Sequence, residues 1–317
     1  MFSAQSYAII GTGALGGLYG GMLARRGFDV HFLANSDVAH LEQSGLKVES
    51  HLGDFHLDEV KVYSDPASLP ACDVTIVALK STKNDLLRHV LPVTTRDGGN
   101  VLVLQNGLDP EKDSVQVVGK DRVLGGCCFL CSNKVGPGHI RHLDYGAIVF
   151  GEYRSDWYGK RPPGRTERAE RIEADLRLAG IDATATDDLL LTRWKKLMWN
   201  IPFNGLSVAL DASTKEIVEC ESSLQLAETI IREVHHSAVT LGVPVPAEWI
   251  GKQIEATKKM MPYDASMRLD FRHGRPMELQ AIFANPIQAA KSVGLEMPSV
   301  SFLLQQLRFL AARQAGD

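Results

Sequence analysis

Apolar residues in the first half of the chain form short continuous runs that alternate with segments of helical spacing. Residues 7–10 are such a run, and the next segment is apolar at intervals of three and four residues from Leu15 to Leu23. Further runs at 29–34, 73–79 and 100–104 have the length of buried strands, with a helix predicted at about 84–91. This alternation predicts a doubly wound, largely parallel sheet with helices on both faces.

Other segments of the first half show antiparallel signals. Residues 46–62 alternate around Gly53-Asp54, which predicts a hairpin-like stretch. Residues 139–142 and 147–150 flank a polar turn at 144–146, and they predict a second hairpin added to the edge of the sheet. The apolar residues 123–130 predict a strand, and residues 154–165 predict a surface loop. A helix is predicted at about 166–179, ended by Gly180, and a short strand at 181–186.

The second half has helical periodicity. Runs at 189–210, 222–241, 249–261 and 277–293 have a period near 3.6 and are separated by glycine- and proline-containing breaks. We therefore predict an α/β chain, with a Rossmann-type doubly wound parallel sheet at 1–187 followed by an all-α C-terminal domain at 188–317. The active site is expected in the cleft between the two domains.

Composition is that of an ordinary globular enzyme. A chain of 317 residues suits about two domains, and 44% hydrophobic and 23% charged residues are typical of globular proteins. A formal charge of −4 gives no reason to expect nucleic acid or an anionic membrane as a partner. No apolar stretch approaches the ~20 residues of a membrane helix, and the N-terminus does not have the pattern of a signal peptide. A cytosolic location is expected.

The five cysteines are interpreted as structural. Cys127, Cys128 and Cys131 lie close together with His139 and His142 nearby, so a zinc site is an alternative. Since no second Cys or His pair follows at ligand spacing, a strand that buries small residues is the favoured reading, and no metal is expected.

The most informative motif is the sequence I-G-T-G-A-L-G-G at 10–17. Its Gly11-x-Gly13-x-x-Gly16 pattern lies between a buried strand and a helix, which is the context of a dinucleotide-binding turn. The first glycine permits a tight turn, the second lets the backbone approach a pyrophosphate, and the third lets the helix pack closely on the strand. The helix N-terminus then offers N–H groups to the phosphates. Two further predicted strands end in polar residues, Lys80-Ser81-Thr82 and Gln105-Asn106-Gly107, at the edge where ligands bind in such sheets.

A second informative segment lies in the helical half, at 193–204. Lys196, Asn200 and Asn204 recur every four residues among bulky apolar neighbours, so they share one helix face with a drift of about 40° per step. Polar groups in such surroundings need partners, which a bound substrate would supply. The alternative is a lysine that reaches solvent and asparagines that bridge helices. Pro202 lacks an N–H, so a kink is expected within this segment.

Over nearly its whole length, the chain resembles the ketopantoate reductase family (2-dehydropantoate 2-reductases). The motifs that carry the resemblance are G-x-G-A-L-G at 11–16, L-K at 79–80, x-N-G at 105–107, W-x-K-L-x-x-N-x-x-x-N at 194–204, S-M-x-x-D at 266–270, and Glu278. The lysine-containing helix is the most specific of them.

The resemblance implies NADPH-dependent reduction of 2-dehydropantoate to pantoate, a step toward coenzyme A. Lys196 would be the general acid, a role that suits an ammonium beside a ketone. Glu278 would hold the substrate hydroxyl and the lysine. The residues implied to bind substrate are Asn106, Asn200, Asn204 and Ser266. Those implied to bind the cofactor are Gly11, Thr12, Gly13, Ala14, Leu15, Gly16, Asn35, Ser36, Lys80 and Asn106. Taken singly, Ser266 is also readable as a first-turn helix residue after an Asp264 N-cap, and Glu278 as a residue placed by the helix dipole.

Two positions depart from the family pattern. The family has an arginine after its second strand for the 2′-phosphate of NADPH, where this chain has Asn35 followed by Ser36. No acidic residue replaces that arginine, so NADP is favoured and NAD stays open. Tyr263 stands where the family often has asparagine, which leaves another 2-keto acid open as substrate.

Two different functions also stay open. One is a dehydrogenase of the 6-phosphogluconate or 3-hydroxyacid type, which shares the two-domain plan. The second is a non-catalytic NADP sensor, although a polar stripe such as that of Lys196 would be of no use to a sensor. The apolar segment from Val300 onward would suit the interface of a homodimer.

Overall fold

The computed structural model describes residues 5–260 and 264–316, and within it the chain divides into two units. The first contains the residues up to Gln105 together with Pro110–Ser155 and Pro162–Leu189. The second contains Asn106–Asp109, Asp156–Arg161 and the chain from Leu190 onward. The main division, after Leu189, lies two residues beyond the boundary expected at 187, and each unit is described by itself.

Within the described residues, the first unit is built on one sheet with the strand order β4-β3-β9-β8-β7-β6-β1-β2-β5, and β10 pairs with β9. The strands are β1 (Ser6–Ile10), β2 (Asp29–Leu33), β3 (Leu46–Ser50), β4 (Phe55–Leu57), β5 (Lys61–Tyr63), β6 (Cys72–Val77), β7 (Thr95–Val103), β8 (Val123–Gly136), β9 (His139–Glu152) and β10 (Ala183–Ala185). The pairs β8–β9 and β3–β4 are antiparallel and the others are parallel. The predicted fold class and the hairpin near Gly53 are thus confirmed.

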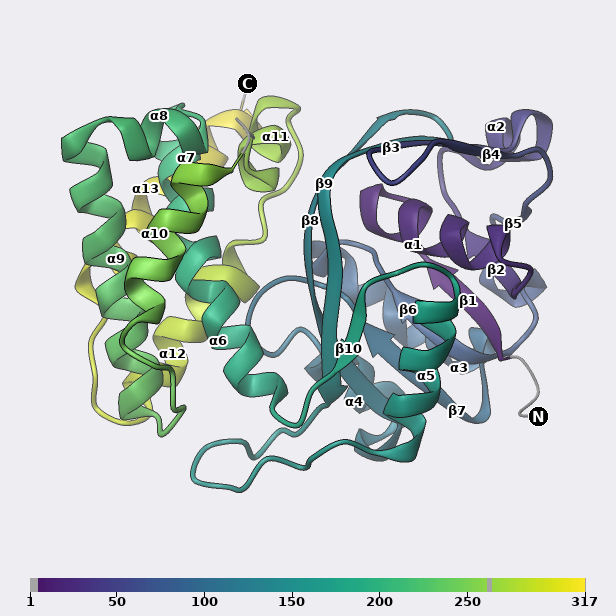
Figure 1. The fold of residues 1–317 in the computed structure, drawn as a ribbon, viewed down its shortest axis with the longest axis horizontal. Coiled ribbons are helices and arrows are strands. Elements are labelled where there is room, and N and C mark those ends of the chain that lie inside the picture. Colours follow the sequence, from purple (N-terminus) through teal and green to yellow (C-terminus); the bar gives the residue numbers. More distant parts are fainter. Residues whose placement is uncertain (1–4, 261–263, 317) are drawn as a thin grey trace. The chain divides into compact units, whose positions relative to one another are not determined.

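Helices cover both faces of this sheet because its central strands are apolar on both sides. Tyr7 and Ile9 of β1 belong to the same hydrophobic cluster as residues of α1 (Ala14–Arg25) and α5 (Glu167–Leu178). Ala8 and Ile10 point to the opposite face, where they pack with Val90 of α3 (Leu87–Thr94). Figure 1 shows α1 and α5 on one side of the sheet and α3 on the other.

The remaining helical segments of this unit are short. They are α2 (Val38–Ser44), α4 (Lys112–Val118) and the 3₁₀ turns Pro66–Ser68, Ser81–Leu86 and Lys120–Arg122. The helix expected at 84–91 is therefore a 3₁₀ turn followed by α3. The helix expected at 166–179 is α5, whose N-cap Thr166 accepts a hydrogen bond from the N–H of Ala169.

The hairpin predicted within 139–150 is wrong. Residues 139–152 form the single strand β9, which pairs antiparallel with β8, and the chain turns between them at Gly138 with φ of 54°. Tyr145 and Gly146, read as a turn, have φ of 59° and 130° but lie inside the strand, where the β8–β9 register shifts. Nor is the hairpin at the edge of the sheet, because β9 pairs on its other side with β3.

The second unit is helical within the residues that the structure describes. Its segments are α6 (Leu189–Trp199), the π turn Asn200–Asn204, α7 (Gly205–Ala209), α8 (Thr214–Glu219), α9 (Glu221–Thr240), α10 (Trp249–Lys259), α11 (Ser266–Arg272), the π turn Gln280–Ala284, α12 (Asn285–Lys291) and α13 (Pro298–Gly316). The Glu233 carboxylate of α9 accepts hydrogen bonds from the N–H groups of Ser299 and Val300, at 3.0 and 2.9 Å, and so holds the start of α13. None of the described helices is both long and apolar enough to cross a membrane.

Candidate functional site

The glycine turn between β1 and α1 brings backbones into close contact. Gly11 has φ of 101°, and a Cβ on it would lie 2.9 Å from the backbone nitrogen of Leu79. A Cβ on Gly16 would lie 2.0 Å from the carbonyl oxygen of Gly11, so the helix can pack here only with glycine. Gly13 differs from both, because nothing lies within 4 Å of a Cβ built on it. Open space beside Gly13, at the N-cap of the twelve-residue helix α1, fits the pyrophosphate of a dinucleotide.

The ends of β6 and β7 are tied together by Gln105. Its side-chain nitrogen donates to the carbonyl oxygen of Leu79 at 2.9 Å and to Oδ1 of Asn84 at 2.7 Å. Lys80 lies between these two acceptors in the chain and is the N-cap of the 3₁₀ turn that follows β6. The structure thus keeps Lys80 in the same unit as the glycine turn, and it shows that Gln105, for which no role was predicted, binds the residues on either side of Lys80.

The residues after β2 form a polar cluster that includes a cation from another strand. Asn35 and Ser36 are exposed, and the Ser36 hydroxyl donates to Oδ1 of the buried Asp37 at 3.0 Å. The Lys134 ammonium, from the end of β8, lies 2.5 Å from Oδ2 of the same carboxylate. Burial raises the pKa of Asp37, but the hydrogen bonds from Lys134 and from the N–H of Gly138 outweigh it, so the pKa lies below its usual value.

Lys134 was not among the residues predicted to bind a ligand. In the sequence, Lys134 is notable only as a lysine in a predicted strand of small, buried residues. Its pairing with Asp37 could not be predicted, because the two residues are far apart in the chain. The structure therefore supplies a cation close to Asn35 and Ser36, where the family pattern has its arginine.

In the helical unit, Lys196 and the two asparagines lie along α6 and the π turn that follows it. Lys196 is half-buried, whereas Asn200 and Asn204 are only 4% and 2% exposed. The kink expected at Pro202 takes the form of this π turn, whose wider i→i+5 pattern accommodates the missing N–H. Because a π turn takes more residues per turn than an α-helix, the step from Asn200 to Asn204 falls short of a full turn, in the direction opposite to the drift from Lys196 to Asn200.

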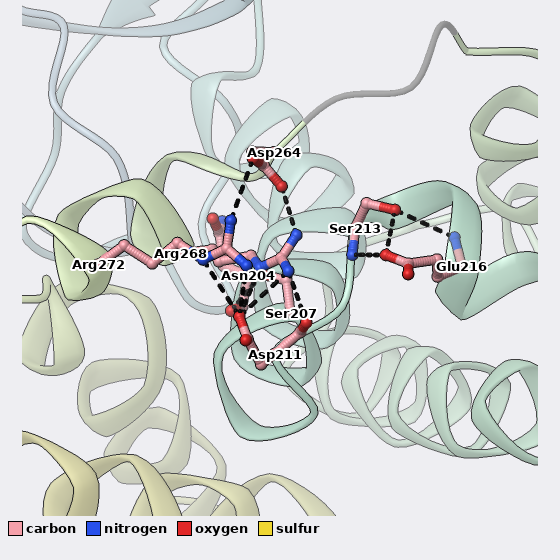
Figure 2. Close-up of polar contacts among 8 residues, drawn as sticks. All are labelled: Asn204, Ser207, Asp211, Ser213, Glu216, Asp264, Arg268 and Arg272. Carbon is pink, nitrogen blue, oxygen red and sulfur yellow. Dashed lines mark hydrogen bonds and ion pairs between the residues drawn. The ribbon is translucent and has the colours of Figure 1, made fainter.

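Ion pairs between two arginines and two aspartates hold α11 in place. Arg268 is 5% exposed, and its Nε donates to Oδ1 of Asp211 at 3.1 Å, while Nη2 of Arg272 lies 2.9 Å from the same oxygen. Asp264 also binds Arg268, from the residues just before the helix. Figure 2 shows both guanidinium groups between the two carboxylates. The expected N-cap role of Asp264 is therefore wrong, because its carboxylate is engaged with arginine and the N-cap residue is Ala265.

Ser266 and Glu278 lie at the two ends of the segment that contains α11. Ser266 is the first residue of α11 and is half-buried. Glu278 is 6% exposed and directly precedes the helical turn that begins at 279, so it is not inside that first turn. Tyr263, the departure from the family pattern, lies outside the described residues.

The structure sorts the predicted site residues into two groups. The glycine turn, Asn35, Ser36 and Lys80 belong to the sheet unit. Lys196, Asn200, Asn204, Ser266 and Glu278 belong to the helical unit. Asn106, which was expected at the end of a strand, is grouped with the helices.

The cysteines and one cavity were also considered as possible sites. The five cysteines are free thiols, and among the described residues no group of three or more His, Cys, Asp or Glu could hold a metal ion. A cavity of about 370 Å³ lies in the sheet unit between α1, the β3–β4 hairpin and the end of α5, and its walls include Arg25, Phe55 and Leu178. None of the predicted site residues lines this cavity.

Comparison with known proteins matches both halves of the chain. The family described as "Ketopantoate reductase PanE/ApbA" matches residues 7–155, and "Ketopantoate reductase PanE/ApbA C terminal" matches residues 188–311. A curated 2-dehydropantoate 2-reductase from Nostoc sp. is 47% identical over 309 residues, which cover 98% of this chain and 96% of the relative.

Solved structures agree with these matches. The crystal structure of a 2-dehydropantoate 2-reductase from Geobacter metallireducens has a TM-score of 0.91 and 38% identity, and the match covers 96% of this chain and 99% of that one. A D-mandelate dehydrogenase in a ternary structure with NADH and anilino(oxo)acetate has a TM-score of 0.86 over 98% and 99% of the two chains. At 18% identity, that second likeness is one of fold alone.

Proposed function

Because this chain belongs to the ketopantoate reductase family, we propose that it reduces the 2-keto group of 2-dehydropantoate to pantoate with NADPH. The chain is an oxidoreductase that acts on a CH–OH group. The substrate is proposed from the name of the 47% identical relative and from the residues of the helical unit. The observation that carries the proposal is the line of Lys196, Asn200 and Asn204, in which a cation is followed by two buried amides.

The sheet unit has the features that a pyridine nucleotide needs. The backbone at Gly13 and the start of α1 would bind the pyrophosphate, and Lys80 would lie near a ribose. For NADP, we propose that Asn35, Ser36 and the Lys134 ammonium bind the 2′-phosphate, since a cation is the group that pairs best with a phosphate. When bound, the reduced nicotinamide supplies the hydride.

In this mechanism the helical unit binds and protonates the substrate. Asn200, Asn204 and Ser266 would hydrogen-bond the keto acid, and the two amides would do so from largely buried positions. The Lys196 ammonium would polarise the ketone and give its proton to the carbonyl oxygen as the carbon is reduced. Glu278 would orient the lysine and the new hydroxyl, so that the products are a CH–OH group and a neutral amine.

Competing functions differ from this one in substrate or in turnover. Tyr263 in place of the family asparagine favours a related 2-keto acid as the second candidate. The decisive experiment mixes the purified protein with NADPH or NADH and a panel of keto acids, including 2-dehydropantoate, and follows nicotinamide absorbance. We expect the highest kcat/KM with 2-dehydropantoate and NADPH. Cofactor binding without turnover of any keto acid would instead identify a sensor, and turnover restricted to a 3-hydroxyacid would identify a different dehydrogenase.

A further inference from the structure

The short segment that carries Asn106 is bound by the helices of the second unit. Gln105 is the last residue of the sheet unit before it, and the sheet unit resumes at Pro110. Between these points the N–H of Leu108 donates to the carbonyl oxygen of Ala281 at 2.8 Å. The segment that begins with Asn106 therefore follows β7 closely in sequence, but its Leu108 is held by a residue much later in the chain.

Two side chains complete this anchoring. The Asn285 amide nitrogen donates to the carbonyl oxygen of Leu108 at 2.7 Å, across 177 residues of sequence. Nη1 of Arg193 donates to the carbonyl oxygen of Gly107 at 3.1 Å. Arg193 is only 3% exposed, and a buried guanidinium is tolerated only when it is hydrogen-bonded. Two successive carbonyl oxygens of the segment are thus satisfied by side chains of the helical unit.

The backbone of Gly107 packs so closely on the backbone of Ala281 that no side chain would fit between them. Gly107 has φ of 101°, and a Cβ on it would lie 2.5 Å from both the carbonyl carbon and the oxygen of Ala281. Since these are backbone atoms, they cannot move aside as a flexible side chain would. The segment is seated directly on the π turn that contains Ala281.

The elements that bind the segment also carry the proposed catalytic groups. Arg193 lies three residues before Lys196 on α6, so the two side chains share one helix face. Ala281 lies three residues after Glu278, and Asn285 begins α12 immediately beyond the same π turn. We propose that Arg193 and Asn285 are positioning residues that fix Asn106 in register with Lys196 and Glu278.

This inference rests on the proposed function, because it assigns Asn106 to the substrate. Asn106 would be preset by the helical unit to contact the keto acid, beside the contact with the cofactor that the family resemblance implies. A small displacement of a group that orients substrate is enough to lower turnover by about 10- to 100-fold.

The sharpest variant is Asn285→Asp. The change is nearly isosteric and keeps an oxygen for the bond from Gln280, at 2.8 Å, but it replaces the donor to Leu108 by a carboxylate oxygen. We expect kcat/KM for the keto acid to fall about 10- to 100-fold, a larger change than that in the dissociation constant of NADPH alone. Gln288→Glu is the matched control, because it makes the same change at an exposed position of the same helix.

A double-mutant cycle separates positioning from a general structural role. Asn106→Ala is made in the wild-type chain and in the Asn285→Asp variant, and the loss of kcat/KM is compared. If Asn285 acts through Asn106, the second substitution costs much less in the variant than in the wild type. Fully additive losses would overturn the proposal. Arg193→Met, tested in the same way, is expected to show the same non-additivity.

Hydrogen exchange at the Leu108 amide tests the anchor without any substrate. We expect faster exchange of this amide in Asn285→Asp than in the wild type or in Gln288→Glu, since the segment opens more often when one of its bonds is lost. Unchanged exchange in an active enzyme would overturn the anchor. A wild-type protein that reduces no keto acid, yet shows the faster exchange on substitution, would leave the anchor standing and refute the proposed function.

Discussion

The side-chain oxygen of Asn204 accepts a hydrogen bond from the backbone N–H of Met267 at 3.3 Å. The N–H groups of a first helical turn have no partner within the helix, so this bond satisfies one of them. It also fixes the start of α11, where Ser266 lies, against the π turn. Asn204 therefore orients a neighbouring helix, in addition to the substrate contact implied by the family pattern.

Asn204→Leu should raise the KM for the keto acid. The substitution keeps the volume but removes the acceptor, and loss of one such bond to a buried group corresponds to about a tenfold change. Asn204→Asp keeps the oxygen and should retain more of the affinity. Ser207→Ala is the control, because the Ser207 hydroxyl donates only to the backbone oxygen of Asn204 and does not reach α11 (Figure 2). Equal KM values for all three variants would contradict this role.

Lys196→Met should lower kcat by about 100-fold or more, since it removes the proposed general acid. The binding of NADPH alone should be unaffected. Lys195→Met is the neighbouring control, because the Lys195 ammonium lies 4.5 Å from the ring centre of Trp249 and has no proposed part in the reaction. Steady-state turnover of the two variants is the measurement, and a kcat for Lys196→Met equal to that of the control would refute the assignment.

Lys134→Met should weaken the binding of NADPH but not that of NADH. Loss of a charge-assisted hydrogen bond to the 2′-phosphate predicts about a tenfold higher dissociation constant for NADPH, with NADH unchanged. Lys47→Met controls for the loss of a half-exposed lysine, because Lys47 pairs with Glu49 at 2.8 Å. Asp37→Asn should strengthen NADPH binding, since it removes the carboxylate that pairs with the Lys134 ammonium and that would repel the phosphate. An equal rise in the dissociation constants of NADPH and NADH would show that Lys134 does not recognise the 2′-phosphate.

The free energy of unfolding should fall between neutral and mildly acid pH because of His142. Burial, and then the neighbouring His51, hold the pKa of His142 below its ordinary value of 6.5. As the pH falls below about 6.5, the unfolded chain takes up this proton before the folded chain does, so the free energy of unfolding falls. Chemical denaturation between neutral and mildly acid pH measures the slope. His142→Gln should flatten it relative to the wild type, and an unchanged slope would exclude this histidine as the cause.

Local signals in the sequence were sufficient for much of the fold. The glycine pattern at 11–16 predicts a turn and a helix start because glycine is required sterically at Gly11 and Gly16. The recurrence of Lys196, Asn200 and Asn204 predicts one polar helix face because helical period is a property of a single segment.

What the sequence could not predict depends on contacts between distant residues. The residues at 144–146 have the composition of a turn, yet pairing with β8 keeps them within β9. The neighbourhood of Lys134 and Asp37 and the anchoring of Leu108 by Asn285 join parts of the chain that no local pattern relates. Both contacts underlie proposals made above, for Lys134 at the 2′-phosphate and for Asn285 as a positioning residue.

The π turn at 200–204 makes the number of residues in this segment as important as their identity. Gly205 follows it directly, and a Cβ on Gly205 would lie 2.5 Å from a methyl carbon of Leu303 in α13. Because an i→i+5 turn holds one residue more than an α-helical turn, removing one residue from it would leave a regular α-helix, with Gly205 still facing α13. The same deletion would shorten the spacing between Asn200 and Asn204, so the two amides would no longer continue the line that begins at Lys196.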